Sequence, residues 1–249
     1  MGTSRRALKV ECNMHIHCNP ADLGRYALIA GDPGRVPLIS RFLDEAREIT
    51  WEREFRIDVG GFRGVRVVAA SHGIGAPSTA ILVEELADLG VDTIIRVGTA
   101  GAIQPDRCRS GLVIASGAIR DERTSTCYLP MEFPAVPALS VLNALIQAAR
   151  EQGVEYHVGI VQAKDSFYGE VEPERQPTSS LLAERWKAWQ MGGALASEME
   201  CATLFIVGAV RRLRTGGILN IMGNPSQMES MILVGLNALK ILAEQDASS

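Results

Sequence analysis

The sequence lacks the long apolar runs that mark membrane-spanning helices and secretory signals. A helix needs about 20 apolar residues to cross a bilayer, and no such run occurs in the 249 residues. Residues 1–20, MGTSRRALKVECNMHIHCNP, also contain no apolar core of signal-peptide length. We therefore expect a cytoplasmic protein without a membrane partner. Residues 1–13 are polar, and we expect a flexible arm there.

Paired cysteines and an excess of positive charge are also missing. No two cysteines form a CxxC pair, which predicts free thiols in a reducing compartment; the five are Cys12, Cys18, Cys108, Cys127 and Cys201. The spacing of Cys12 and Cys18 with His15 and His17 matches no zinc pattern, so we predict no metal site there. The formal net charge of -4 argues against a nucleic-acid partner, because phosphate backbones require a basic face.

The sequence has enough hydrophobic residues for one core, and its predicted strands and helices alternate regularly. Hydrophobic residues make up 47% of the chain, and its length fits one α/β domain, which we place at 14–249. Apolar runs typical of strands occur at 26–30, 65–71, 93–97, 112–118, 157–163 and 217–222. Apolar residues at helical spacing occur at 77–89, 138–152, 198–212 and 228–244.

This alternation predicts a single α/β domain with a central mixed, mainly parallel β-sheet flanked by helices. In such folds ligands bind beyond the carboxyl ends of the strands. The residues that follow each predicted strand are therefore the candidates for function.

Two arginines come at or after predicted strands. Arg35 ends the turn GDPGR (31–35), where glycine permits close backbone approach to an anion and the guanidinium offers a fork of donors. The alternative is an ordinary surface turn. Arg96 lies inside the apolar run TIIRV, so its guanidinium should be buried and should need a partner. That partner is either a phosphate, held also by Thr99 and backbone N–H groups, or a carboxylate in a structural salt bridge.

Two further pairs could bind a sugar and a base. Glu198 and Glu200 precede an apolar helical run and could grip vicinal hydroxyls, or could favour the helix dipole at an N-terminus. Phe167 and Tyr168 follow another strand and could stack on a base, or could be core aromatics. The residue pattern alone leaves both alternatives open.

In this order, these segments resemble the nucleoside phosphorylase family, which includes uridine phosphorylase and hexameric purine nucleoside phosphorylase. The strongest match is SHGIGAPSTAILVEEL (71–86), with a glycine pair, Pro-Ser and Glu-Leu at the family's offsets. Further similar blocks are GDPGRV (31–36), REF (53–55), IIRVGTAGAIQPD (94–106), EFPAV (132–136), KDSFYG (164–169) and ASEMECATLF (196–205). The resemblance runs from about His15 to the last helix.

The resemblance implies roles for individual residues. The implied phosphate site consists of Gly31, Arg35, Arg96, Gly98 and Thr99, with Arg53 lent by a neighbouring subunit. The implied ribose contacts come from Glu198, Met199 and Glu200, with His15 reaching the 5′-hydroxyl from that neighbour. The implied base contacts come from Phe167, Glu170 and Arg175. Arg96 and Glu200 are the residues expected to carry catalysis.

The resemblance also implies the reaction: phosphorolysis of a nucleoside, with uridine favoured, to the free base and ribose 1-phosphate. Inorganic phosphate is the co-substrate and no organic cofactor is expected, although relatives can bind a potassium ion through the counterparts of Glu54 and Ser78. Because Arg53 and His15 would act in a neighbour's site, we expect a homodimer, or a hexamer built as a trimer of dimers.

Two departures from the family concern the base. Glu170 stands where uridine enzymes carry a glutamine, and an ionised carboxylate cannot donate to a carbonyl. Residues 226–229 lead almost directly into the last helix, where relatives have a longer loop over the base. Purine enzymes carry an aspartate after the late strand, and this chain has Met-Gly-Asn at 222–224, which counts against purines. A purine nucleoside phosphorylase stays an alternative because it shares the fold and the phosphate site. The other alternative is a non-catalytic nucleoside-binding relative that has lost its lid loop.

Overall fold

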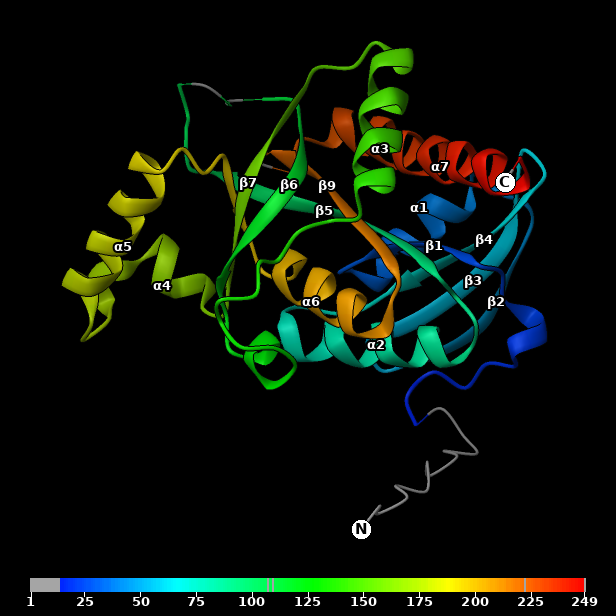
Figure 1. Cartoon of the computed structure of the whole chain (residues 1–249), viewed down its shortest axis with the longest axis horizontal. Helices are drawn as coiled ribbons and strands as arrows, with labels where there is room; N and C mark the ends of the chain where they lie inside the picture. The colour runs from blue at the N-terminus through cyan, green and yellow to red at the C-terminus, as the bar shows by residue number, and fades with distance from the viewer. Residues whose placement is uncertain (1–13, 107, 109, 222, 249) are drawn as a thin grey trace.

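A computed structural model describes residues 14–106, 108, 110–221 and 223–248; the predicted arm at 1–13 and Met222 lie outside the described residues. The centre is a nine-stranded sheet in the order β2-β3-β4-β1-β5-β8-β7-β6-β9 (Figure 1). Its strands are β1 (Tyr26–Ala30), β2 (Asp44–Glu52), β3 (Phe55–Phe62), β4 (Val65–Ser71), β5 (Thr93–Ala102), β6 (Leu112–Asp121), β7 (Tyr156–Lys164), β8 (Ala196–Glu198) and β9 (Arg214–Ile221).

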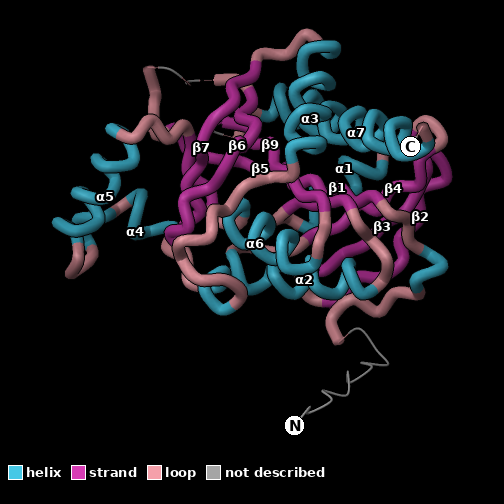
Figure 2. The backbone as a smooth tube through the Cα atoms, viewed as in Figure 1, coloured by secondary structure: helices cyan, strands magenta, loops and turns pink. Residues whose placement is uncertain are grey.

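Helices cover both faces of the sheet (Figures 1 and 2). Those described are α1 (Val36–Ser40), α2 (Ala76–Asp88), α3 (Leu139–Gln152), α4 (Phe167–Val171), α5 (Ser179–Met191), α6 (Cys201–Arg211) and α7 (Pro225–Ala247). Helices α2 and α6 pack on one face, and α1, α3 and α7 on the other. Helices α4 and α5 project beside β7, and none of the α5 residues is buried. The predicted α/β fold with a central mixed sheet between helices is confirmed.

Strand β5 organises the sheet because it pairs with three neighbours. It runs parallel to β1 and β9, and its last residues pair antiparallel with β8. Strands β8, β7, β6 and β9 pair in turn, so five strands close into a ring through β5. Among the described strands, five of the nine pairings are parallel, so parallel pairing dominates only narrowly.

All six predicted strands and all four predicted helices are present, with shifted ends. The largest shift is in β5, which runs to Ala102 and not only to Val97. The helix expected at 198–212 begins only at Cys201, because Glu198 still belongs to β8. The sequence did not predict the hairpin β2–β3, the short strand β8, or helices α1, α4 and α5. Within the described ranges no helix combines the length and apolarity needed to cross a membrane.

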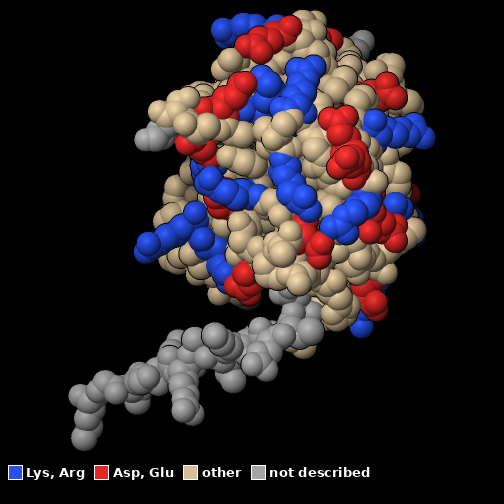
Figure 3. All heavy atoms as spheres, turned by 90° about the vertical axis from the view of Figure 1, so that its right-hand side faces the viewer, with Lys and Arg blue, Asp and Glu red and all other residues tan. Residues whose placement is uncertain are grey.

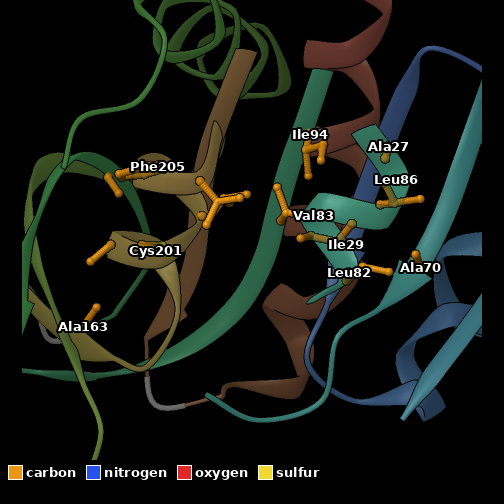
Figure 4. Packing of buried hydrophobic residues seen from close by; sticks show 14 of the residues in the cluster. Ala27, Ile29, Ala70, Leu82, Val83, Leu86, Ile94, Ala163, Cys201 and Phe205 are labelled. Carbon is orange, nitrogen blue, oxygen red and sulfur yellow. The ribbon is translucent and has the colours of Figure 1, made fainter. Parts of the chain in front are cut away.

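The larger hydrophobic cluster lies between the sheet and the α2–α6 layer. Figure 4 shows Leu82, Val83 and Leu86 of α2 turned toward the strands that carry Ile29 and Ile94. All five side chains are almost fully buried, and burying each one stabilises the fold by about 1.5–3 kcal/mol. This packing fixes β1, β4 and β5 relative to α2.

The described surface mixes charges of both signs. Figure 3 shows lysine and arginine side chains interspersed with aspartate and glutamate on the side that carries β2 to β4. Four of the cysteines are free thiols, as expected: Cys18, Cys108, Cys127 and Cys201. Cys12 lies outside the described residues.

Candidate active site

The carboxyl ends of parallel strands meet at one edge of the sheet. Ile29 on β1 lies opposite Ala70 on β4 and Arg96 on β5. The chain leaves β1 at Gly31, where an added Cβ would lie 3.0 Å from the carbonyl oxygen of Gly73. A side chain at 31 would therefore require the loop at Gly73 to shift by a few tenths of an ångström.

Arg96 is buried at this edge and is held by three side chains. Its Nε donates to Glu198 Oε2 at 3.3 Å, one Nη donates to Glu200, and the other lies 3.0 Å from His72 Nε2. Burial by itself would lower the pKa of Arg96, but the carboxylates of Glu200 and Glu198 outweigh it and raise that pKa. The chain thus supplies the salt-bridge partner that was one of the two sequence alternatives. Gly98 leaves room for this guanidinium, since an added Cβ would lie 2.8 Å from Arg96 Cζ.

Glu198 and Glu200 accept hydrogen bonds from different parts of the chain. Glu198 has a fully buried side chain, and it accepts from the backbone N–H groups of Glu200 and Cys201 at the start of α6. It therefore satisfies helix N–H groups that would otherwise lack partners. Burial, and then the charge of Glu200, raises the pKa of Glu198.

Glu200 turns the other way, across to α2. It accepts from the Gly75 backbone N–H at 2.7 Å as well as from Arg96. Burial opposes its ionisation, but Arg96 and this N–H group lower the pKa of Glu200 and keep it charged. The spacing ExE thus separates a carboxylate that caps a helix from one that lies at the sheet edge.

His72 was not predicted from sequence, although it lies within the quoted segment 71–86. It is fully buried, and burial together with Arg96 lowers its pKa to about 3. The ring is therefore neutral, with Nε2 accepting from Arg96 and Nδ1 lying 3.1 Å from Thr79 Oγ1. Thr79 Oγ1 in turn donates to the Gly75 carbonyl. A lone histidine among polar neighbours gives no sequence signal for this positioning role.

Arg35 lies beside Arg96, close enough for the two positive charges to interact. It ends a short 3-10 helix (Pro33–Arg35) whose first turn is capped by Asp32, which accepts from Gly34 N at 2.8 Å. Burial, and then the positive charge of Arg96, lowers the pKa of Arg35. Its side chain makes no hydrogen bond or ion pair within the described part of the chain. A half-buried guanidinium beside another one calls for an anion.

The remaining predicted phosphate and ribose residues lie around this cluster. Thr99 is half-buried on β5, next to Gly223, and Met199 is half-buried between β8 and α6. Arg53 occupies the β2–β3 turn with a positive φ of 54°, and its exposed side chain has no recorded partner in the described chain. His15 is held elsewhere, with Nδ1 2.6 Å from Glu85 Oε1 and its ring edge-on to Phe55. Within one chain, neither Arg53 nor His15 contacts the Arg96 cluster.

The segment predicted to bind the base begins with two exposed aromatic rings. Phe167 and Tyr168 are 52% and 59% exposed, so they are not the core aromatics of the alternative interpretation. Their rings meet edge-to-face with centroids 5.4 Å apart. Farther along, Arg175 is exposed and pairs with Glu172, three residues earlier.

Glu170 points inward and pairs with Lys164 and Ser197. It also lines a cavity of about 640 Å³ between β7, α4 and α5, whose far wall carries Trp186 and Trp189. This volume is typical of small-molecule sites. Neither Arg35 nor Arg96 lines this cavity.

Comparison with known proteins places these residues in a family context. A profile described as "Phosphorylase superfamily" matches residues 25–237. The chain is 42% identical to a uridine phosphorylase of Treponema pallidum, across 95% of this chain and 96% of that protein. It is 44% identical to a uridine phosphorylase of Thermococcus kodakarensis, with 93% and 87% covered. It is also 38% identical to a guanosine phosphorylase of Halorubrum lacusprofundi, with 84% and 83% covered.

Proposed function

Because the chain belongs to the phosphorylase superfamily, we propose that it cleaves nucleosides with inorganic phosphate, uridine among them, to a free base and ribose 1-phosphate. The observation that carries this proposal is the Arg35 guanidinium beside Arg96 at the edge of the sheet, which has no hydrogen-bond or ion-pair partner among the described residues. Two uridine phosphorylases at 42% and 44% identity support the choice of nucleoside. The guanosine phosphorylase relative keeps a purine substrate as the second candidate.

In this proposal the phosphate lies between Arg35 and Arg96, with the backbone of Gly31 and Gly98 and the hydroxyl of Thr99 around it. Such contacts are charge-assisted and strong in a partly dry site. A phosphate oxygen attacks C1′, the C1′–N bond breaks, and the base leaves with the electron pair. The sugar gains positive charge on the way, and the adjacent phosphate stabilises it.

We assign the ribose to Glu200, which is ionised and already at the edge of the cluster. Met199, the residue before Glu200, would pack against the sugar. We assign no sugar contact to Glu198. Its side chain is fully buried behind Arg96 and already accepts hydrogen bonds from α6 and from Arg96.

The charge balance favours a second subunit. Arg35 and Arg96 are offset by Glu198 and Glu200, and His72 is neutral because its pKa is about 3. A phosphate dianion therefore needs another cation. We propose that Arg53 of a second copy supplies it, and that His15 of that copy reaches the ribose 5′-hydroxyl. The twofold dimer, alone or three times in a hexamer, remains the proposed assembly.

Two smaller proposals have local support. Ser78 Oγ donates to Glu54 Oε1 at 2.9 Å, so the two oxygens proposed to bind a potassium ion already lie together. A cytoplasmic location agrees with the four free thiols, because reducing compartments keep cysteines unpaired.

The test is base release from uridine, thymidine, inosine and guanosine, each with and without phosphate. We expect release that requires phosphate, and we expect Arg35→Met to lower kcat/KM for phosphate by about 10- to 100-fold, the usual size for a lost charged contact. Arg41→Met is the matched control, because Arg41 is an exposed arginine just after α1 with no side-chain partner recorded. Equal phosphate dependence in the Arg35 variant and the wild type would contradict the assignment.

A further inference from the structure

Beside the Arg96 cluster, Lys164 and Glu170 form a nearly buried ion pair. Lys164 ends β7 and Glu170 lies in α4, with Nζ 2.5 Å from Oε2. Their side chains are only 8% and 15% exposed. Shielding two charges from water is costly unless their remaining hydrogen-bonding capacity is used. The hydrogen-bonding groups that remain on the pair therefore need partners.

Lys164 and Glu170 each keep one hydrogen-bonding position that no described residue uses. An ammonium group has three donors, and Lys164 uses them on Ser197 Oγ at 2.7 Å and on Glu170, which leaves one. Ser197 also donates to Glu170 Oε2. The other carboxylate oxygen, Oε1, accepts from no group in the described residues. The pair thus presents one free donor and one free acceptor side by side.

These free groups face the last residues of β5 and β8. Glu170 Oε1 is 3.5 Å from where a Cβ on Gly101 would be, so no side chain stands between the carboxylate and β5. Gly101 lies opposite Ser197 in the sheet. Thr99 is two residues before Gly101, and Glu198 directly follows Ser197. Gly101 and Ser197 thus lie two residues and one residue along their strands from Thr99 and Glu198.

The surroundings suit a flat ring. Lys164 and Glu170 both line the 640 Å³ cavity. The exposed ring of Phe167 lies with its centroid 6.0 Å from Lys164 Nζ, and a planar base could stack on it. Arg175, by contrast, is 66% exposed and already paired with Glu172.

We propose that Lys164 and Glu170 together read the base: the ammonium donates to a ring carbonyl and the carboxylate accepts from the adjacent ring N–H. This inference rests on the proposed function. It gives the donor role to Lys164 instead of Arg175. An amide side chain offers one donor and one acceptor, and here two charged residues supply that combination, so the departure at Glu170 does not abolish recognition.

The substrate class follows from the edge that is read. Uracil, hypoxanthine and guanine carry a ring N–H next to a carbonyl. Cytosine and adenine carry an unprotonated ring nitrogen next to an amino group, which reverses donor and acceptor. With the ribose fixed at Glu200, the enzyme selects nucleosides of the first group over cytidine and adenosine.

The test compares kcat/KM for uridine and 3-methyluridine, in which the ring N–H is replaced, in the wild type, Lys164→Met and Glu170→Leu. The wild type should prefer uridine by about 100-fold or more, because a site built for a hydrogen bond rejects an analogue that lacks it. Each variant should lose about 10- to 100-fold on uridine and less than about 3-fold on 3-methyluridine. A purely structural role would lower both substrates equally.

Lys240→Met is the matched control, because Lys240 lies in α7, does not line this cavity and pairs only at the surface with Glu244. It should keep the uridine preference. Equal losses on both substrates, or a preference that disappears in Arg175→Met but not in Lys164→Met, would overturn the inference. A wild type that cleaves no nucleoside with phosphate would instead refute the proposed function, so the two failures are distinguishable.

Discussion

At Gly98 the absence of a side chain decides where the Arg96 guanidinium can lie. A Cβ there would sit 2.8 Å from Cζ and from one Nη, closer than real Cβ atoms approach. Gly98→Ala should therefore displace the guanidinium and lower kcat/KM by about 100-fold, the scale reported for ångström-sized misplacements. Thermal stability should also fall, because the displaced guanidinium leaves the buried carboxylates of Glu198 and Glu200 without their cation. Activity within about 3-fold of the wild type would show that Arg96 need not lie there.

Single residues show the limit of sequence reasoning most clearly. The turn glycines and Arg35 could be singled out because they follow an apolar strand, and Arg96 because a cation inside TIIRV needs a partner. The different contacts of Glu198 and Glu200 could not be predicted, because they depend on where β8 ends and α6 begins. The role of His72 could not be predicted either, because the ring is neutral only through burial against Arg96, which is 24 positions away.

Among the elements, those with a strong apolar pattern were predictable. Strand β1 is buried at all five positions, and α6 buries eight of its residues. Strand β2 is mostly exposed and α5 buries none of its residues, so neither carries the periodicity that a core imposes. The segment predicted to bind the base lies beside α5, so the sequence could not predict which way Glu170 points.

The close approach of α3 to β9 gives a prediction at the element scale. A Cβ on Gly216 would lie 2.4 Å from Val141 Cγ1. Gly216→Ala should cost about 1–3 kcal/mol of unfolding free energy through overpacking. The double variant Gly216→Ala with Val141→Ala should cost less than the sum of the two single changes, because the smaller residue makes room. Denaturant unfolding measures all three, and strictly additive losses would show that α3 and β9 adjust independently.

For the whole molecule, the proposed sharing of sites predicts complementation. Arg53→Ala and Arg96→Ala homodimers should both be nearly inactive. A mixed dimer has one doubly altered site and one intact site. Random mixing by co-expression should then restore about a quarter of wild-type activity, since half the dimers are mixed and half their sites are whole. Tagged subunits and activity per purified mixed dimer provide the measurement, and no recovery in confirmed mixed dimers would contradict the shared site.

The sequence separation inside the Arg96 cluster has a consequence for how the protein is made. Arg96 and its two carboxylate partners are 102 and 104 positions apart. A ribosome adds about 5–20 residues per second, so the arginine leaves the peptidyl-transferase centre roughly 5 to 20 seconds before the carboxylates that neutralise it. Over that interval the nascent chain holds an uncompensated cation within the apolar segment TIIRV. The cluster therefore forms late in biosynthesis, and prematurely terminated chains that end before 198 cannot assemble it.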